Sequence, residues 1–166
     1  SAISVRPEFA LALQMIGGAL ADRATGYVAT SATSGDAIRA TPYSPQGANA
    51  QRSIKSSSAN DAAAGSGART VRLRYLDTSF EVKEEVIALN GTTAVNTAAT
   101  DIAFVESLEV VTVGTQGGGN AGTISLYTGT GGGGSVWASI AASDNKTYWA
   151  HHYVPAGKTC YLLNVS

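Results

Sequence analysis

Apolar and polar residues alternate most clearly in the middle of the chain. In the stretch RTVRLRYLD, the apolar residues Val71, Leu73 and Tyr75 alternate with the basic residues Arg72 and Arg74. Alternation with a period of two predicts a β-strand that has one buried and one solvated face. The arginines therefore belong to the face of a strand that is open to solvent.

A second apolar stretch, FEVKEEVIAL, follows at residues 80–89. Its alternation shifts phase at Val86 and Ile87, which predicts a β-bulge or a strand that changes sheet. The sequence LDTSF between the two stretches has the length of a hairpin loop. Asn90-Gly91, directly after the second stretch, is a strong turn signal.

Short apolar stretches recur about every 8–14 residues as far as the C-terminus, each ended by Gly, Asn, Asp or Pro. Within 101–114 both parities are apolar, so both faces of that strand are expected to meet apolar neighbours over part of its length. The segment from Pro155 to Lys158 is expected to be a turn between two strands, without chemistry of its own. The remaining strands are predicted near residues 52–58, 123–129, 136–142, 147–154 and 159–165. The pattern indicates an antiparallel β-sandwich or jelly-roll-like domain, and the lack of βαβ alternation argues against a doubly wound fold.

The one helical pattern lies in residues 8–22, where four apolar residues form a single stripe. These residues are Phe9, Leu13, Ile16 and Leu20. A short helix and an extended arm that docks on a partner both fit this segment. We expect an N-terminal arm over residues 1–53 and a β-sandwich domain over residues 54–166.

Composition narrows the possible functions. The chain has 11 Lys and Arg against 12 Asp and Glu, so it lacks the basic excess that phosphate-dominated nucleic-acid binding needs. No apolar run is long enough for a membrane-spanning helix. Charged residues make up 14% of the chain, which also has 19 glycines. A surface with few charges resists association poorly, so we expect a homo-oligomer, for example a trimer.

Candidate catalytic and metal-binding residues are few. His151 and His152 are adjacent on a predicted strand, so they point to opposite faces and do not converge on one metal. Glu81, Glu84 and Glu85 differ in parity and are better explained by a solvated strand face than by paired catalytic carboxylates. The single cysteine, Cys160, excludes a disulfide framework within the chain. We predict no enzymatic activity, no cofactor and no metal.

The glycine-rich runs at residues 114–122 and 129–134 resemble phosphate-binding loops only in composition. A strand follows each run, whereas a phosphate loop needs a helix N-terminus. We interpret both runs as connections between strands.

Aromatic residues gather in the C-terminal third of the chain. Trp137, Trp149 and Tyr153 are candidates for a protomer interface or for the sandwich core, since buried aromatic residues dominate both. An exposed tryptophan that stacks on a sugar is the alternative. The candidate interface residues therefore comprise these three together with the apolar stripe of residues 8–22.

Four phrases occur in order: SSSANDAAAGSGARTVRLRYLD, EVIALNGTTAVNT, TQGGGNAGTISL and YVPAGKTCYL. The series resembles a repeated module of small structural proteins of tailed bacteriophages, particularly phages of aquatic bacteria, over residues 54–166. The resemblance implies a β-sandwich virion component that carries no catalytic residues. Its expected location is the capsid surface, as a decoration or cement protein whose partners are the major capsid protein or other virion subunits.

Two alternatives stay open. One is another virion location, in the neck, tail or baseplate. The other is a carbohydrate-binding β-sandwich module that uses Trp137 or Trp149.

Overall fold

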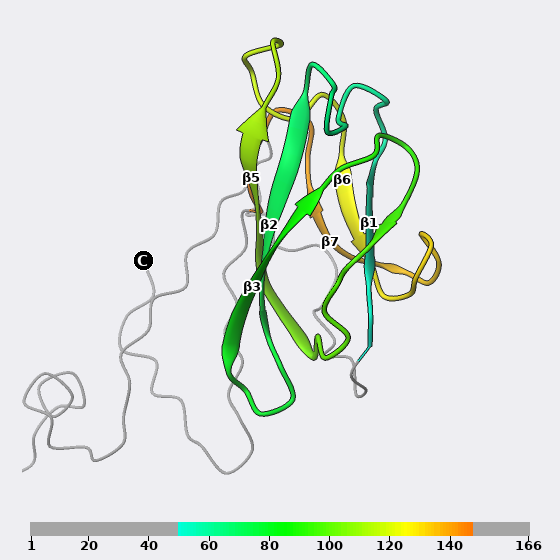
Figure 1. Cartoon of the computed structure of the whole chain (residues 1–166), viewed down its shortest axis with the longest axis vertical. Helices are drawn as coiled ribbons and strands as arrows, with labels where there is room; N and C mark the ends of the chain where they lie inside the picture. The colour runs from blue at the N-terminus through cyan, green and yellow to red at the C-terminus, as the bar shows by residue number, and fades with distance from the viewer. Residues whose placement is uncertain (1–49, 148–166) are drawn as a thin grey trace, which may run out of the picture.

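The computed structural model describes residues 50–147, and every regular element in this range is a β-strand (Figure 1). The strands are β1 (Ser53–Ser56), β2 (Ala68–Leu76), β3 (Val82–Ala88), β4 (Val95–Asn96), β5 (Phe104–Val113), β6 (Ile124–Tyr127) and β7 (Val136–Ile140). They form two antiparallel sheets, which confirms the all-β prediction and is consistent with a β-sandwich. The predicted helix at residues 8–22, the turn from Pro155 to Lys158 and the strand at residues 159–165 lie outside the described residues, as does all but the first residue of the strand predicted at 147–154. Residues 50–147 contain no helix with the length and hydropathy to cross a membrane.

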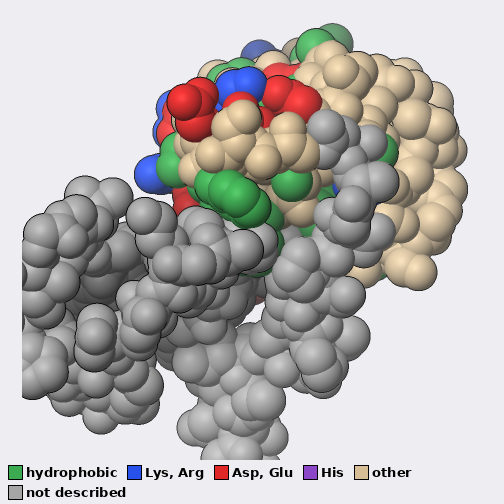
Figure 2. Space-filling view, turned by 90° about the horizontal axis from the view of Figure 1, so that it is seen from below, with side chains coloured by type: hydrophobic (Ala, Val, Ile, Leu, Met, Phe, Trp, Pro, Cys, Tyr) green, Lys and Arg blue, Asp and Glu red, His purple; other side chains and the backbone are tan. Residues whose placement is uncertain are grey.

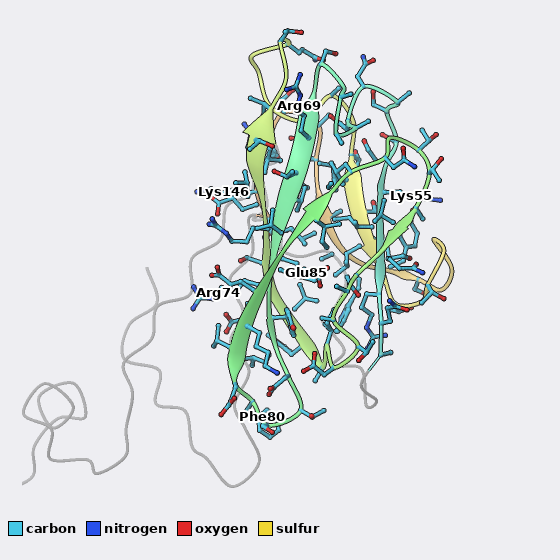
Figure 3. The ribbon with its side chains drawn as sticks, in the orientation of Figure 1. Lys55, Arg69, Arg74, Phe80, Glu85 and Lys146 are labelled. Atoms are coloured by element: carbon cyan, nitrogen blue, oxygen red, sulfur yellow. The ribbon has the colours of Figure 1, made fainter. Side chains whose placement is uncertain are left out.

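The three-stranded sheet has the order β3-β2-β5, so β2 is its central strand. The predicted alternation is confirmed, because Val71, Leu73 and Tyr75 are buried while the Arg74 side chain points outward (Figure 3). Val71 and Leu73 have no exposed surface at all. The hairpin from β2 to β3 is also confirmed, and its loop closes with a bond from the Asp77 N–H to the Glu81 carbonyl.

The predicted bulge or sheet change in β3 is wrong. β3 pairs with β2 without a register shift from Val82 to Ala88. Ile87 faces the core with 4% of its surface exposed, whereas Val86 faces solvent with 54% exposed. The apparent phase shift therefore comes from an exposed valine on an edge strand, and the backbone stays regular.

Bulges occur instead where β5 pairs with β2. Arg74 lies opposite Ser107 and Tyr75 lies opposite Val105, so Glu106 is an extra residue on β5. The expectation that both faces of this strand meet apolar neighbours holds only near its start, where Phe104 and Val105 are both buried.

Near the end of β5, Val111 and Val113 are 41% and 42% exposed. Val111 is also an extra residue, because the neighbouring β2 residues Val71 and Thr70 pair with Val110 and Thr112. An extra residue bends the strand and re-aims its side chains, which a fixed two-residue period cannot anticipate.

The four-stranded sheet has the order β4-β1-β6-β7. β1 is central although it contributes only four residues, and Ile54 on it is fully buried. On β6, which lies within the strand predicted near residues 123–129, Ile124 and Leu126 point inward. The alternation of apolar and polar residues does not predict β4, because its two residues are too few to show a period.

The core lies between the two sheets and draws on both. The buried apolar residues that form one cluster are Ile54, Ala68, Val71, Leu73, Tyr75, Ile87, Leu89, Ile102, Val105, Leu108, Ile124, Leu126, Trp137, Ala138 and Ile140. Figure 1 shows β2, β3 and β5 in one layer, with β1, β6 and β7 in the other. Burial of this cluster is the dominant stabilising term.

Candidate functional site

The side chain of Asp61 accepts hydrogen bonds from several segments of the described domain. Its carboxylate has no exposed surface and accepts four hydrogen bonds. Oδ1 accepts from the N–H groups of Ala68 and Ala121, both at 2.8 Å. Oδ2 accepts from the Ser56 hydroxyl at 2.6 Å and from the Gly122 N–H at 2.9 Å.

These bonds connect segments that are distant in sequence. Ser56 ends β1, Ala68 begins β2, and Gly122 precedes β6, so one carboxylate joins both sheets. Gly67 must lack a side chain here, because a Cβ on it would lie 2.3 Å from Asp61 Oδ1. Without a side chain at Gly67, the backbone approaches Asp61 closely enough for the N–H of Ala68 to donate directly to its carboxylate.

The chemistry of Asp61 follows from its partners. Three backbone N–H groups and one hydroxyl occupy its acceptor positions, and solvent does not reach it. Such a carboxylate pairs buried donors that would otherwise be unsatisfied. We assign Asp61 a structural role, which is to hold together the three chain segments whose groups donate to its carboxylate.

A second polar cluster lies at the β2–β3 hairpin. Lys83 Nζ is 2.8 Å from Asp77 Oδ2 and 2.8 Å from Asp101 Oδ2. Tyr75 Oη donates to Asp101 Oδ1 at 3.4 Å. Figure 2 views the molecule from the end where the hairpin tip lies and shows acidic and basic side chains side by side.

The electrostatics of this cluster favour its charged form. Hydrogen bonds to Asp101 and Asp77 raise the pKa of Lys83, so its ammonium stays protonated. The hydrogen bond from Lys83 lowers the pKa of Asp77, helped by backbone N–H donors. Burial, followed by the charge of Asp101, raises the pKa of Tyr75. A lysine held charged between two carboxylates is neither a nucleophile nor a base at neutral pH.

Asp77 also shapes the loop that follows it. Its Oδ1 accepts from the N–H groups of Ser79 at 2.8 Å and Glu81 at 2.9 Å. Such side chain to backbone bonds are typical of Asp at the start of a turn. Phe80, at the hairpin tip in Figure 3, has a φ of 62°, a conformation that costs a residue with a Cβ about 1–2 kcal/mol.

Arg52 is a buried cation beside an aromatic ring. Its guanidinium lies 4.8 Å from the centroid of Trp137 and donates to the carbonyl oxygens of Thr128 and Ile102. Arg52 is 3% exposed and Trp137 is 4% exposed. The arrangement ties the segments after β6 and before β5 to the chain preceding β1.

The glycine-rich runs bind the domain's own side chains. The N–H of Gly131 donates to Asn96 Oδ1, and that of Gly132 donates to Ser53 Oγ, both at 2.8 Å. Gly119 lies against Asn145, where an added Cβ would be 1.9 Å from Oδ1. Both runs connect strands, as the sequence predicts.

The outward face of the three-stranded sheet carries paired charges. Arg72 lies 3.3 Å from Glu109 and 3.7 Å from Glu84, and Arg74 lies 2.9 Å from Glu106. Their side chains are between a quarter and just over a half exposed, so each pair contributes little to stability. The predicted solvated strand face is confirmed.

The glutamates that the sequence singles out do not converge. Glu84 faces Arg72 on the outer surface, whereas the Glu85 carboxylate accepts from the N–H groups of Ala98 at 2.6 Å and Ala99 at 3.0 Å. Residues 50–147 hold no group of three or more His, Cys, Asp or Glu side chains placed to bind a metal.

The structure places only one of the predicted interface residues. Trp137 belongs to the core cluster of its own domain. Phe9, Leu13, Ile16, Leu20, Trp149 and Tyr153 lie outside the described residues, as do His151, His152 and Cys160.

Sequence reasoning missed Asp61 and the carboxylate partners of Lys83. Asp61 stands in the low-complexity run SSSANDAAAGSGA, where nothing distinguishes it from a loop aspartate. Its importance comes from Ala121 and Gly122, which are about sixty positions away. The turn signal at Asp77 was the one local clue.

No protein-family model, no curated protein and no solved structure matches this chain.

Proposed function

We propose that the chain is a structural subunit of a tailed-bacteriophage virion, and specifically a capsid decoration or cement protein. The series of sequence phrases that resembles phage structural modules supports this, as does the all-β fold. The observation that supports this proposal most strongly is that buried polar side chains bond within the domain itself. Asp61, Arg52 and Asn120 all bond to backbone of the domain's own loops, as in a rigid building block.

The mechanism we propose is mechanical. A rigid sandwich sits on the shell and contacts the major capsid protein or other virion subunits, and apolar burial between subunits stabilises the particle. The attachment arm expected over residues 1–53 ends before Ala50 in this proposal, because Arg52 is buried in the sandwich and Ser53 begins β1. The chain that follows the arm serves as a jelly-roll-like domain. Many repeated contacts then add up across the lattice, and homo-oligomerisation, for example into trimers, increases their number.

Electron microscopy of the intact particle tests the location. The account predicts density for the two-sheet domain on the outside of the head, repeated over the shell. Density in the neck, tail or baseplate would replace the decoration role with another virion role. A particle that contains no copy of the chain would remove the virion proposal altogether.

One of the two tryptophans that the carbohydrate-binding alternative needs, Trp137, is buried. A sugar needs an exposed ring face to stack on, and Trp137 is 4% exposed beneath Arg52. Trp149 lies outside the described residues, so a glycan array with the wild-type chain and Trp149→Ala is the remaining test. Binding that disappears in the variant would support this alternative over the structural one.

A further inference from the structure

The dipeptide Asn90-Gly91 forms a turn beside the loop that connects β1 to β2. Asn90 follows β3, is exposed to solvent and makes a β-bridge with Ala62 of that loop. Gly91 is buried. Its N–H donates to the Asp61 carbonyl at 2.8 Å, and its carbonyl accepts from the Ser56 N–H at 2.9 Å. The domain therefore holds the peptide groups on both sides of this glycine.

Position 91 strongly favours glycine. Its φ is 60°, a left-handed conformation that residues with a Cβ rarely adopt. A Cβ on Gly91 would also lie 3.1 Å from the Cα and 3.2 Å from the carbonyl oxygen of Ala59. The fold thus keeps a glycine directly after an exposed asparagine, and this pair of residues has a chemistry of its own.

An asparagine that precedes glycine can lose its side-chain amide without an enzyme. The glycine nitrogen attacks Cγ of the asparagine, so that a C–N bond forms and a succinimide ring closes. The side-chain amide group leaves as ammonia, taking up the proton of the attacking nitrogen. Water then opens the ring at either carbonyl, which gives aspartate or isoaspartate. A glycine has no side chain to hinder this attack.

In the folded domain the attacking nitrogen is already engaged. The Gly91 N–H points at the Asp61 carbonyl, away from the side chain that it would attack. Asp61 is a rigid acceptor, because it is fully buried and its carboxylate bonds to four donors. Ring closure therefore requires that this turn opens first.

We propose that Asn90 is a site of spontaneous deamidation that the folded domain keeps unreactive and that opening of the turn makes reactive. An isoaspartate at position 90 carries the main chain through its side chain, which lengthens the backbone by one methylene. Gly91 then no longer fits between Asp61 and Ser56, so the reaction locks an opened turn in its open form. The inference draws only on the contacts of this turn and holds whether or not the protein belongs to a virion.

Peptide mass spectrometry of the full chain tests the protection. The wild-type chain is incubated at mildly alkaline pH in buffer and in guanidinium chloride, and conversion of Asn90 is followed with time. We expect conversion at least tenfold slower in buffer, because only chains with an open turn react. Gly91→Ala in denaturant is the matched control and should react more slowly than wild type. Equal wild-type rates in buffer and denaturant, or no conversion in denaturant, would overturn the proposal.

Hydrogen exchange tests whether release of the Gly91 N–H controls the reaction. Ser56→Ala removes the hydroxyl that donates to Asp61 Oδ2 at 2.6 Å and keeps the backbone N–H that donates to Gly91. We expect faster exchange of the Gly91 amide and, by the same factor, faster deamidation of Asn90 in buffer. Glu109→Gln, on the outer face, should change neither rate by more than about twofold. Faster exchange without faster deamidation in Ser56→Ala would contradict this control.

Refolding tests the lock. Chains that carry isoaspartate or aspartate at position 90 are separated by chromatography after treatment with denaturant and are returned to buffer. We expect the aspartate form to regain slow exchange of the Gly91 amide, as briefly denatured wild type does, and the isoaspartate form not to regain it. Equal protection of the two forms would show that the turn tolerates the longer backbone and would refute the lock.

Discussion

At the scale of single residues, the most consequential side chain is one that a sequence does not reveal. Asp61 stands among Ser, Ala and Gly, and local propensity predicts only a loop. Its four donors come from three separated segments, so its role appears only when the sheets are assembled. The arginines of β2 are the opposite case, because period-two alternation is a local property and predicted their exposed face.

Replacing Asp61 should be severely destabilising. Asp61→Ala leaves the N–H groups of Ala68, Ala121 and Gly122 buried without their acceptor, and we expect a loss of about 3–5 kcal/mol in the free energy of unfolding. Urea denaturation of the purified chain measures this. Glu109→Gln, which changes an exposed carboxylate on the outer face, should stay within about 0.5 kcal/mol of wild type. Equal effects of the two substitutions would show that Asp61 does not hold the loops.

Replacing Phe80 should raise the free energy of unfolding, in contrast to replacing Asp61. Its φ of 62° favours glycine, so Phe80→Gly should raise the free energy of unfolding by about 0.5–1 kcal/mol after the entropy of the unfolded chain is counted. Val82→Gly, in the same hairpin but in regular strand conformation, should lower it by at least about 0.5 kcal/mol. Thermal unfolding of both variants provides the comparison. A loss of stability in Phe80→Gly would mean that the ring's contacts outweigh the backbone strain.

At the scale of elements, alternation identified β2, β3, β5 and β6 because each shows a period over several residues. The same reasoning misread β3, where the apolar character of Val86 suggested a buried position on an edge that is open. It also did not find the extra residues Glu106 and Val111 of β5, since a bulge depends on the partner strand. Periodicity thus predicts which segments are strands, and pairing decides which faces they show.

The β2–β3 hairpin should depend on pH through its ion cluster. The pKa of Asp77 is lowered in the folded state, so its contribution is present above about pH 4 and is lost as the pH falls through the folded pKa. The pKa of Lys83 is raised, so its contribution is present below about pH 10.4 and is lost as the pH rises through the folded pKa. The cluster therefore stabilises the hairpin between these limits.

Asp77→Asn tests this assignment. The amide oxygen can still accept from Ser79 and Glu81, but the charge opposite Lys83 is gone. We expect the urea midpoint of the variant to change less than that of wild type between pH 2 and pH 5, as measured by fluorescence at a series of pH values. An unchanged pH profile would assign the acid sensitivity to other carboxylates.

At the scale of the whole molecule, the described domain is a pair of antiparallel sheets around one core, with its loops tied by Asp61 and Arg52. Sequence reasoning anticipated the all-β architecture from evenly spaced strand signals. Sequence reasoning could not predict the candidate polar clusters, because each cluster joins residues from different turns. The resulting picture is a rigid unit whose proposed role is to bind neighbours on a shell.

The temperature at which phage particles release their DNA tests this central claim most directly. Particles assembled with and without the protein are heated, and release is followed with a dye that fluoresces on free DNA. The account predicts release several degrees lower when the protein is missing, with recovery when purified protein is added back. Identical release temperatures for particles that do carry the protein on their heads and particles that lack it would contradict a shell-stabilising role.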